Sequence, residues 1–213
     1  SKFEEVMVRA VIIFILTLLF GGCSIIQEPQ SIDIDNQGLY KSYLNHYDYT
    51  LNLSQYIDKV AFDCSALIMI INQKNNNIYK FDNLSKFYDR DGRRSQAMYN
   101  LYGSKNRLYY SNPRPGDLIF FNNTTHVTRN KSSHKITHIG IVTKVKSNGG
   151  IEFLHNINGR NIISVMNLQH KDTHKVDGKK INAYIIANCY EPSCLVSNRF
   201  SGFGRVDKNI YVK

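Results

Sequence analysis

The sequence predicts an α+β fold, a single domain in which helices come first and an antiparallel sheet follows. Two observations predict it. Segments with helical character lie before Gly103, and β-branched or aromatic runs separated by Gly, Asn or Lys-rich turns dominate after Asp117. Helices followed by a meander of strands are typical of this class.

The first residues are set aside because they predict an export signal. Residues 11–20 are apolar apart from one threonine, basic residues precede them, and two glycines follow. This layout is typical of a signal peptide, which we expect to span 1–22, since the apolar run is short for a membrane-spanning helix. A buried helix is the alternative.

Cleavage there would leave Cys23 as the first residue. The stretch Leu-Phe-Gly-Gly-Cys at 19–23 resembles the lipobox of bacterial lipoproteins, which implies that Cys23 carries a diacylglycerol anchor. Residues 23–36 are polar with one proline and predict a short tether. We therefore expect an exported lipoprotein, held at a membrane and facing the cell wall or periplasm.

The remaining chain is long enough for one domain with a sizeable core, which we place at 37–190. The formal net charge of +10 is spread along the whole chain without a dense basic run. This predicts no nucleic-acid partner. The charge suits anionic cell-wall polymers, and general solubility explains it equally well.

Individual elements follow from local pattern. Tyrosine-rich segments at 39–47 and 51–57 predict short helices, residues 66–71 are apolar on every side and predict burial, and 94–102 predicts an amphipathic helix ended by Gly103. Predicted strands cover 118–121, 137–146, 151–155, 161–166 and 181–187.

The first candidate for chemistry is Cys64, which follows Asp63, a good N-cap, at the start of the buried segment. A free thiol has a pKa near 8.5, and a helix N-terminus stabilises the thiolate and offers backbone donors to an oxyanion. Taken alone, such a cysteine is more often a small buried hydrophobe.

Two histidines lie on the strands that follow. Alternation places His138 and Gly140 on one face, where the glycine would leave room for a substrate chain. If Lys146 pairs with Ile151 across the turn, His155 lies on the same face as His138 but about 13 Å further along the strand. The two side chains can meet only if a bulge or a strong twist intervenes.

Four blocks of sequence now resemble one family in the same order. Residues 63–67, Asp-Cys-Ser-Ala-Leu, resemble a D-C-S-G-L block, and 94–99 resemble an R-[ST]-x-x-Q-x helix. Residues 114–121 resemble a strand P-G-D-L-[IV]-F-F, and 138–142 resemble H-[VI]-G-[IV]-[YV]. These are motifs of the NlpC-type cell-wall cysteine peptidases, and the resemblance covers about 56–168.

The resemblance implies a reduced papain-like fold, with the nucleophile at a helix N-terminus packed on an antiparallel sheet. It also implies an endopeptidase that cleaves peptidoglycan stem peptides, commonly between D-glutamate and the diamino acid. In this family pattern Cys64 attacks the carbonyl, His138 is the base and His155 orients the imidazole. Neither a metal nor another cofactor is required.

The same resemblance suggests substrate-binding residues, namely Tyr56, Asp63, Ser65 and Gly140. Tyr56 only stands in for a tyrosine-glycine-glycine stretch that the family has and this sequence lacks. Ala66 replaces the family's usual glycine. The choice of substrate within the wall therefore stays open.

Two features lie beside the motifs. The loop at 122–136 carries His126 and His134, which with His138 suggest a zinc site, although the spacing fits a solvated loop better. Cys189 and Cys194 flank a proline turn and predict a disulfide, with two free thiols as the alternative. Residues 191–213 are interpreted as a C-terminal extension.

Three other functions compete with the peptidase. A papain-like amidase would cut elsewhere in the stem, and an acyltransferase of the same broad group would act on lipids. A wall-binding lipoprotein without activity would keep the fold alone. The joint presence of Cys64, His138 and His155 favours the enzyme, because a binding protein has no physical need of the three together.

Overall fold

The computed structural model describes residues 47–213, which belong to one compact unit. The expected signal peptide, the Cys23 anchor and the tether lie outside these residues, as does all but the last residue of the helix expected at 39–47. From residue 47 onward, no helix is both long and apolar enough to cross a membrane.

Within residues 47–213, the helices are α3 (Cys64–Lys74), α4 (Arg94–Ser104) and α5 (Val196–Arg199), and short 3-10 helices are Ser54–Tyr56, Leu84–Phe87, Leu168–His170 and Pro192–Cys194. The strands are β1 (Tyr49–Leu51), β2 (Leu108–Tyr109), β3 (Leu118–Asn122), β4 (Ile136–Val145), β5 (Gly150–Ile157), β6 (Arg160–Asn167), β7 (Lys175–Val176), β8 (Lys179–Lys180), β9 (Phe200–Gly204) and β10 (Ile210–Val212).

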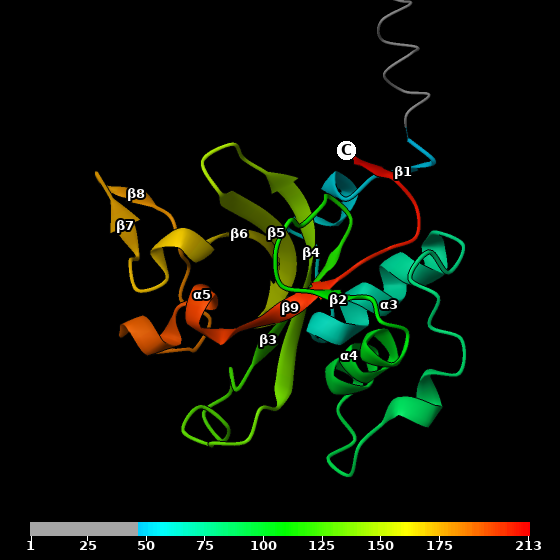
Figure 1. Ribbon diagram of the computed structural model, residues 1–213, viewed down its shortest axis with the longest axis horizontal. Helices are drawn as coiled ribbons and strands as arrows, with labels where there is room; N and C mark the ends of the chain where they lie inside the picture. Colours follow the sequence, from blue (N-terminus) through cyan, green and yellow to red (C-terminus); the bar gives the residue numbers. More distant parts are fainter. Residues whose placement is uncertain (1–46) are drawn as a thin grey trace, which may run out of the picture. The chain divides into compact units, whose positions relative to one another are not determined.

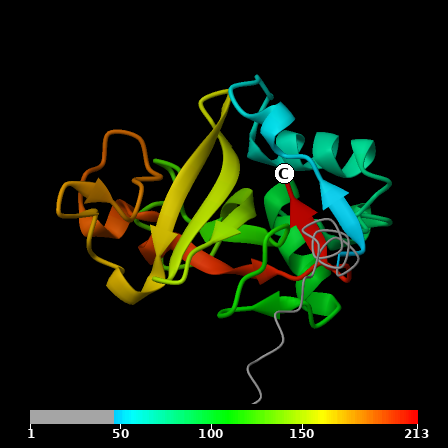
Figure 2. The ribbon, with the colours of Figure 1, turned by 90° about the horizontal axis from the view of Figure 1, so that it is seen from above.

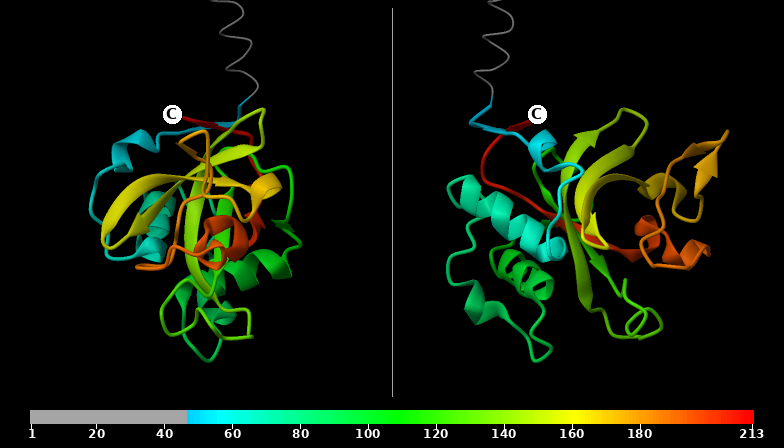
Figure 3. Two further views of the ribbon diagram at one scale, coloured as in Figure 1. Left: turned by 90° about the vertical axis from the view of Figure 1, so that its left-hand side faces the viewer. Right: turned by 180° about the vertical axis from the view of Figure 1, so that it is seen from behind.

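One antiparallel sheet organises the domain, and among the described residues it has six strands in the order β2-β9-β3-β4-β5-β6. The long helices α3 and α4 cover one face, and the segment that contains α5 covers the other (Figure 1; Figure 3, right). The predicted α+β class with a papain-like arrangement of helices on a sheet is confirmed.

Strand β3 shows why both faces are covered. All five of its residues are buried. Leu118 and Phe120 pack with the helices α3 and α4, whereas Ile119 and Phe121 pack on the opposite side with residues such as Ile186 and Val196. An apolar run without polar alternation is the pattern of a strand that is buried on both faces.

The hairpin of β4 and β5 contains the irregularity that the two histidines require (Figure 2 shows the sheet from above, between the helices and the segment that follows β6). The turn pairs Val145, rather than Lys146, with Ile151, and a bulge between Val142 and Lys144 shifts the register once more. Gly140 therefore pairs with His155. The offset between His138 and His155 falls from four residues to two, which is a diagonal neighbour on the same face.

Two predicted elements were wrong. Residues 181–187 form no regular strand, because their backbone donors bond to two different partners: Ala183 N–H to Val165 and Ile185 N–H to Cys194. The helix expected at 51–57 is only the 3-10 turn Ser54–Tyr56, and Leu51 belongs to β1, which pairs in parallel with β10.

The boundary drawn at residue 191 is also corrected. Strand β9 lies inside the sheet between β2 and β3, and β10 pairs with β1 near the start of the domain. Arg205 forms a 3.1 Å ion pair with the buried Asp117 at the head of β3. Residues 191–213 are therefore part of the domain. The sequence did not predict this, because the pairing of short strands with distant partners leaves no local signal.

Candidate active site

The nucleophile candidate Cys64 is the first residue of α3. Asp63 is the N-cap, with an extended backbone, and its carboxylate accepts hydrogen bonds from Ala66 N–H and Ser65 Oγ, both at 2.7 Å. This cap starts the helix where the sequence predicted and sets the thiol at the positive end of the helix dipole. Asp63 and Ser65 thus stabilise the N-terminus of α3, and both also line the cavity in front of Cys64.

Three backbone groups surround the thiol. Burial and, to a lesser extent, the negative charge of Asp63 raise the pKa of the Cys64 thiol to about 11. Hydrogen bonds from the backbone of Ile139, Ser65 and Cys64 itself favour the thiolate and act in the opposite direction. At neutral pH the thiol therefore keeps its proton. The Ile139 contact also ties α3 to β4 beside His138.

A chain of hydrogen bonds runs through the two histidines. His138 Nε2 lies 2.8 Å from His155 Nδ1, and His155 Nε2 lies 2.8 Å from Ser164 Oγ on β6. The two rings meet edge to face, with centroids 5.1 Å apart. This chain crosses three neighbouring strands and fixes both imidazoles.

Both imidazoles are neutral in the resting protein. Burial lowers the pKa of His138 to about 4, although the Asp63 carboxylate acts to raise it. Burial, together with the charge of His138, lowers the pKa of His155 well below its ordinary value. A thiolate–imidazolium pair between Cys64 and His138 is therefore not the favoured resting state. Within the described residues, the Cys64 thiol and the His138 ring share no hydrogen bond.

Two cavities meet at Thr137. A cavity of about 340 Å³ lies in front of Cys64 and is lined by Asp63, Cys64, Ser65, Tyr88, Gly92, Arg93, Arg94, Ser95 and Thr137. A second, of about 310 Å³, lies beside His138 and is lined by Thr124, Thr125, His126, Thr137, His138, Asn156, Ile157, Asn158, Tyr184, Ile185, Ile186 and Ala187. A bound chain that passes Thr137 would reach both.

Two residues expected at the site lie elsewhere. A Cβ on Gly140 would come within 2.7 Å of the Leu154 carbonyl oxygen, so this glycine serves the close approach of β5 rather than a substrate. Tyr56 is buried in the helix-side core, and its hydroxyl has no hydrogen-bond partner among residues 47–213. Neither residue lines the cavities at Cys64 or His138.

Sequence reasoning missed one residue of the site, Ser164, and the structure also places three further candidates, Asn156, His126 and His134. Ser164 ends the histidine chain, but a serine in an apolar strand gives no hint of its partner. Asn156 bonds to Asn161 and Ala61 rather than to a histidine. His126 lines the cavity beside His138 and His134 does not. In residues 47–213, no group of His, Cys, Asp and Glu side chains could hold a metal ion.

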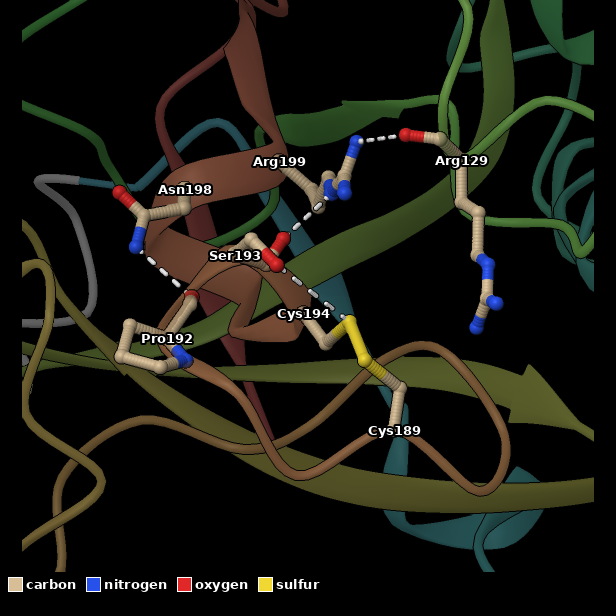
Figure 4. The surroundings of a disulfide bond; sticks show 7 residues. All are labelled: Arg129, Cys189, Pro192, Ser193, Cys194, Asn198 and Arg199. Carbon is tan, nitrogen blue, oxygen red and sulfur yellow. Dashed lines mark hydrogen bonds between the residues drawn. A yellow bond between two sulfur atoms is a disulfide. The ribbon is translucent and has the colours of Figure 1, made fainter.

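Cys189 and Cys194 form a disulfide in the segment that borders this second cavity (Figure 4). Arg199 reaches from α5 across the disulfide turn, donating to the carbonyl oxygens of Ser193 at 2.6 Å and Arg129 at 3.1 Å. The turn and the loop at 122–136 are thereby joined.

The NlpC/P60 family model matches residues 20–179, which is most of the chain. The chain belongs to the NlpC/P60 family. Proteins of the NlpC/P60 family are in general cysteine peptidases or hydrolases of the cell wall, so membership indicates cell-wall peptidase activity on a peptidoglycan peptide. All four motif blocks fall inside the NlpC/P60 match, whereas residues 184–187 and β9 lie beyond it.

No curated protein matches the chain. No solved structure matches it either.

Proposed function

We propose that this NlpC/P60 protein is a cysteine endopeptidase that hydrolyses peptide bonds in peptidoglycan stem peptides. The observation that carries the proposal is a thiol at a helix N-terminus beside the His138–His155–Ser164 chain. Nucleophile, base and orienting group are the three parts of covalent acyl transfer.

The direction of the histidine chain decides which nitrogen acts. If His138 Nε2–H donates to His155 Nδ1, then His155 Nε2–H donates to Ser164 Oγ, and each of the two contacts joins one donor to one acceptor. His138 Nδ1 is then left as an acceptor for the thiol proton. We assign this tautomer because the opposite one would leave His138 without its acceptor nitrogen free.

The reaction begins from the neutral pair. As Cys64 Sγ attacks the carbonyl carbon, its proton passes to His138, and the carbonyl oxygen gains the negative charge. The oxyanion collapses, the C–N bond breaks, and His138 gives the proton to the leaving amine. Water then attacks the thioester carbonyl and loses a proton to His138. The C–S bond breaks, the carboxylic acid is released, and His138 returns the proton to the Cys64 sulfur.

The helix N-terminus and His155 support the charges that develop. The backbone N–H groups around the thiol supply a preorganised site for an anion, which is worth more in a dry site than in water. His155 stays neutral and accepts the Nε2–H bond, which strengthens when His138 becomes an imidazolium.

The bond between D-glutamate and the diamino acid is the proposed target. The cavity in front of Cys64 carries one acid, Asp63, and two bases, Arg93 and Arg94. A stem fragment with a free amine and free carboxylates complements such a lining. This assignment rests on the family resemblance together with that charge pattern.

Anchoring through Cys23 is a separate proposal, supported by the lipobox-like stretch at 19–23. Cys23→Ser should move the protein from the membrane fraction to the soluble fraction, and unchanged partitioning would favour a plain signal peptide or an anchor helix.

The test of the activity uses purified peptidoglycan and a defined stem peptide. The natural protein should release fragments whose masses identify the cleaved bond, and Cys64→Ala should release none. If the natural protein keeps its free Cys64 thiol but releases no fragments, the result would favour the wall-binding alternative. Fragments cut at the sugar–peptide amide would identify an amidase.

A further inference from the structure

The cavity beside His138 has a wall that the family match does not include. Residues 184–187 form that wall, facing the loop residues Thr124, Thr125 and His126 across the cavity. The match to the family ends at residue 179. This part of the site is therefore built by a segment that lies outside the family match.

Both walls are held in place before any ligand binds. Ile185 and Ile186 are buried in the core on that side of the sheet, and Ile185 N–H donates to the carbonyl oxygen of Cys194 at 2.9 Å. The Cys189–Cys194 disulfide closes the next turn, and Arg199 joins this turn to the loop at Arg129 (Figure 4). Preorganised walls of this kind favour selective binding.

The lining of this cavity differs in charge from that of its neighbour. Asp63, Arg93 and Arg94 line the cavity in front of Cys64, whereas the described residues beside His138 include no Asp, Glu, Lys or Arg. The polar groups beside His138 are hydroxyls, amides and the His126 imidazole. A free ammonium placed there would lose water without gaining a carboxylate, which is costly.

We infer that the cavity beside His138 binds the leaving-group part of the peptide substrate and selects leaving residues without a free ammonium. The inference rests on the proposed function, because His138 must protonate the leaving amine and that part of the substrate must therefore lie on its side. A diamino acid whose side-chain amine is acylated, as in a cross-link, fits this lining, and the same residue with a free amine does not.

The first experiment compares two stem peptides that differ only at the side-chain amine of the leaving residue, free in one and acetylated in the other. The acetylated peptide should have a KM roughly tenfold lower, the order expected for an ammonium that is desolvated without a partner. Equal KM values, or a preference for the free amine, would overturn the inference.

The second experiment changes the wall itself. Ala187 is exposed and lines the cavity, so Ala187→Glu adds a carboxylate without disturbing the core. This variant should lower the KM of the free-amine peptide and narrow the difference between the two peptides. Val127→Glu is the matched control, because Val127 is 74% exposed and does not line the cavity. The same narrowing in the control, or none in Ala187→Glu, would also contradict the inference.

Binding to Cys64→Ala separates this inference from the proposed reaction. Suppose that the natural protein cleaves neither peptide, that Cys64→Ala binds the acetylated one more tightly, and that Ala187→Glu on that background narrows the difference. The inference about the cavity is then supported and the proposed reaction is contradicted. Cleavage of both peptides with equal KM values would support the proposed reaction and contradict the inferred selectivity of the cavity. If neither peptide is cleaved by the natural protein or bound by Cys64→Ala, the proposed reaction and the inferred selectivity are both contradicted.

Discussion

The imidazole of His138 is tied to that of His155 by a 2.8 Å hydrogen bond between Nε2 and Nδ1. This contact exists because two shifts of one residue each, the pairing of Val145 with Ile151 at the turn and a bulge between Val142 and Lys144, bring Gly140 rather than Val142 opposite His155. The bond occupies one nitrogen of His138 and leaves the other for the thiol. The strand register of one hairpin thus sets the direction of proton transfer.

Substitutions along this chain should lower kcat in a graded order. We expect His155→Asn to be milder than His155→Ala, since an amide oxygen still accepts the imidazole N–H, and His138→Ala to leave almost no activity. Steady-state kinetics on one stem peptide checks the order. A fully active His155→Ala variant would show that the chain has no part in catalysis.

Ser164→Ala tests the far end of the chain. His155 is fully buried, and the loss of the serine hydroxyl leaves its Nε2–H without a partner. We expect kcat to fall several-fold with little change in KM. Ser164→Thr, which keeps the hydroxyl, is the matched control and should retain more activity than Ser164→Ala.

Alkylation of Cys64 should follow a neutral thiol. Because burial raises the pKa of Cys64 to about 11, the rate with iodoacetamide, mapped to the peptide that contains Cys64, should still be rising at pH 9. Asp63→Asn keeps the cap and removes the charge that opposes the thiolate, so it should shift this profile to lower pH. A plateau at mildly acid pH would indicate a resting ion pair instead.

Stability should fall in acid through the same histidines. The pKa of His138 is about 4 in the folded protein and near 6.5 when unfolded, so the unfolded chain binds more protons between these values. The contribution is fully present above about pH 6.5 and is lost as the pH falls toward 4, at a cost on the order of 3 kcal/mol. Urea unfolding at pH 7 and pH 4 should show a smaller loss for His138→Gln than for the natural protein.

The disulfide should stabilise the wall of the second cavity. Replacing both Cys189 and Cys194 with serine should lower the free energy of unfolding by about 2 kcal/mol, the value expected for a short closed loop. Reduction of the natural protein should raise its mass by roughly two daltons, the mass of two hydrogens. Alkylation of both thiols without reductant would contradict the bridge.

The start of α3 could be predicted from sequence because its signal is local. Asp63 caps the helix through its own side chain, and the apolar residues that follow it, which include Leu67, Ile68 and Ile71, are buried as their hydrophobicity predicted. Strands β3 to β6 were found for the same reason, from short runs between turns. Simple geometry required a bulge or a strong twist between the two histidines. It did not predict the bulge at Val142–Lys144, because alternation alone does not show where an extra residue is inserted.

Features that depend on distant partners were missed. Strand β9 joins the sheet between β2 and β3, and nothing near Phe200 announces that pairing. Ser164 meets His155 only through the register of β5 and β6. Gly140 was interpreted as space for substrate, whereas the space is taken by the backbone of β5.

The central claim, that Cys64 forms a covalent acyl-enzyme with a stem peptide, can be tested by mass spectrometry of protein quenched in acid during turnover. The protein mass should rise by that of the acyl fragment, and digestion should place the fragment on Cys64. His138→Ala should show little of this adduct. Cleavage of the peptide with no adduct, or with the fragment on another residue, would contradict the claim.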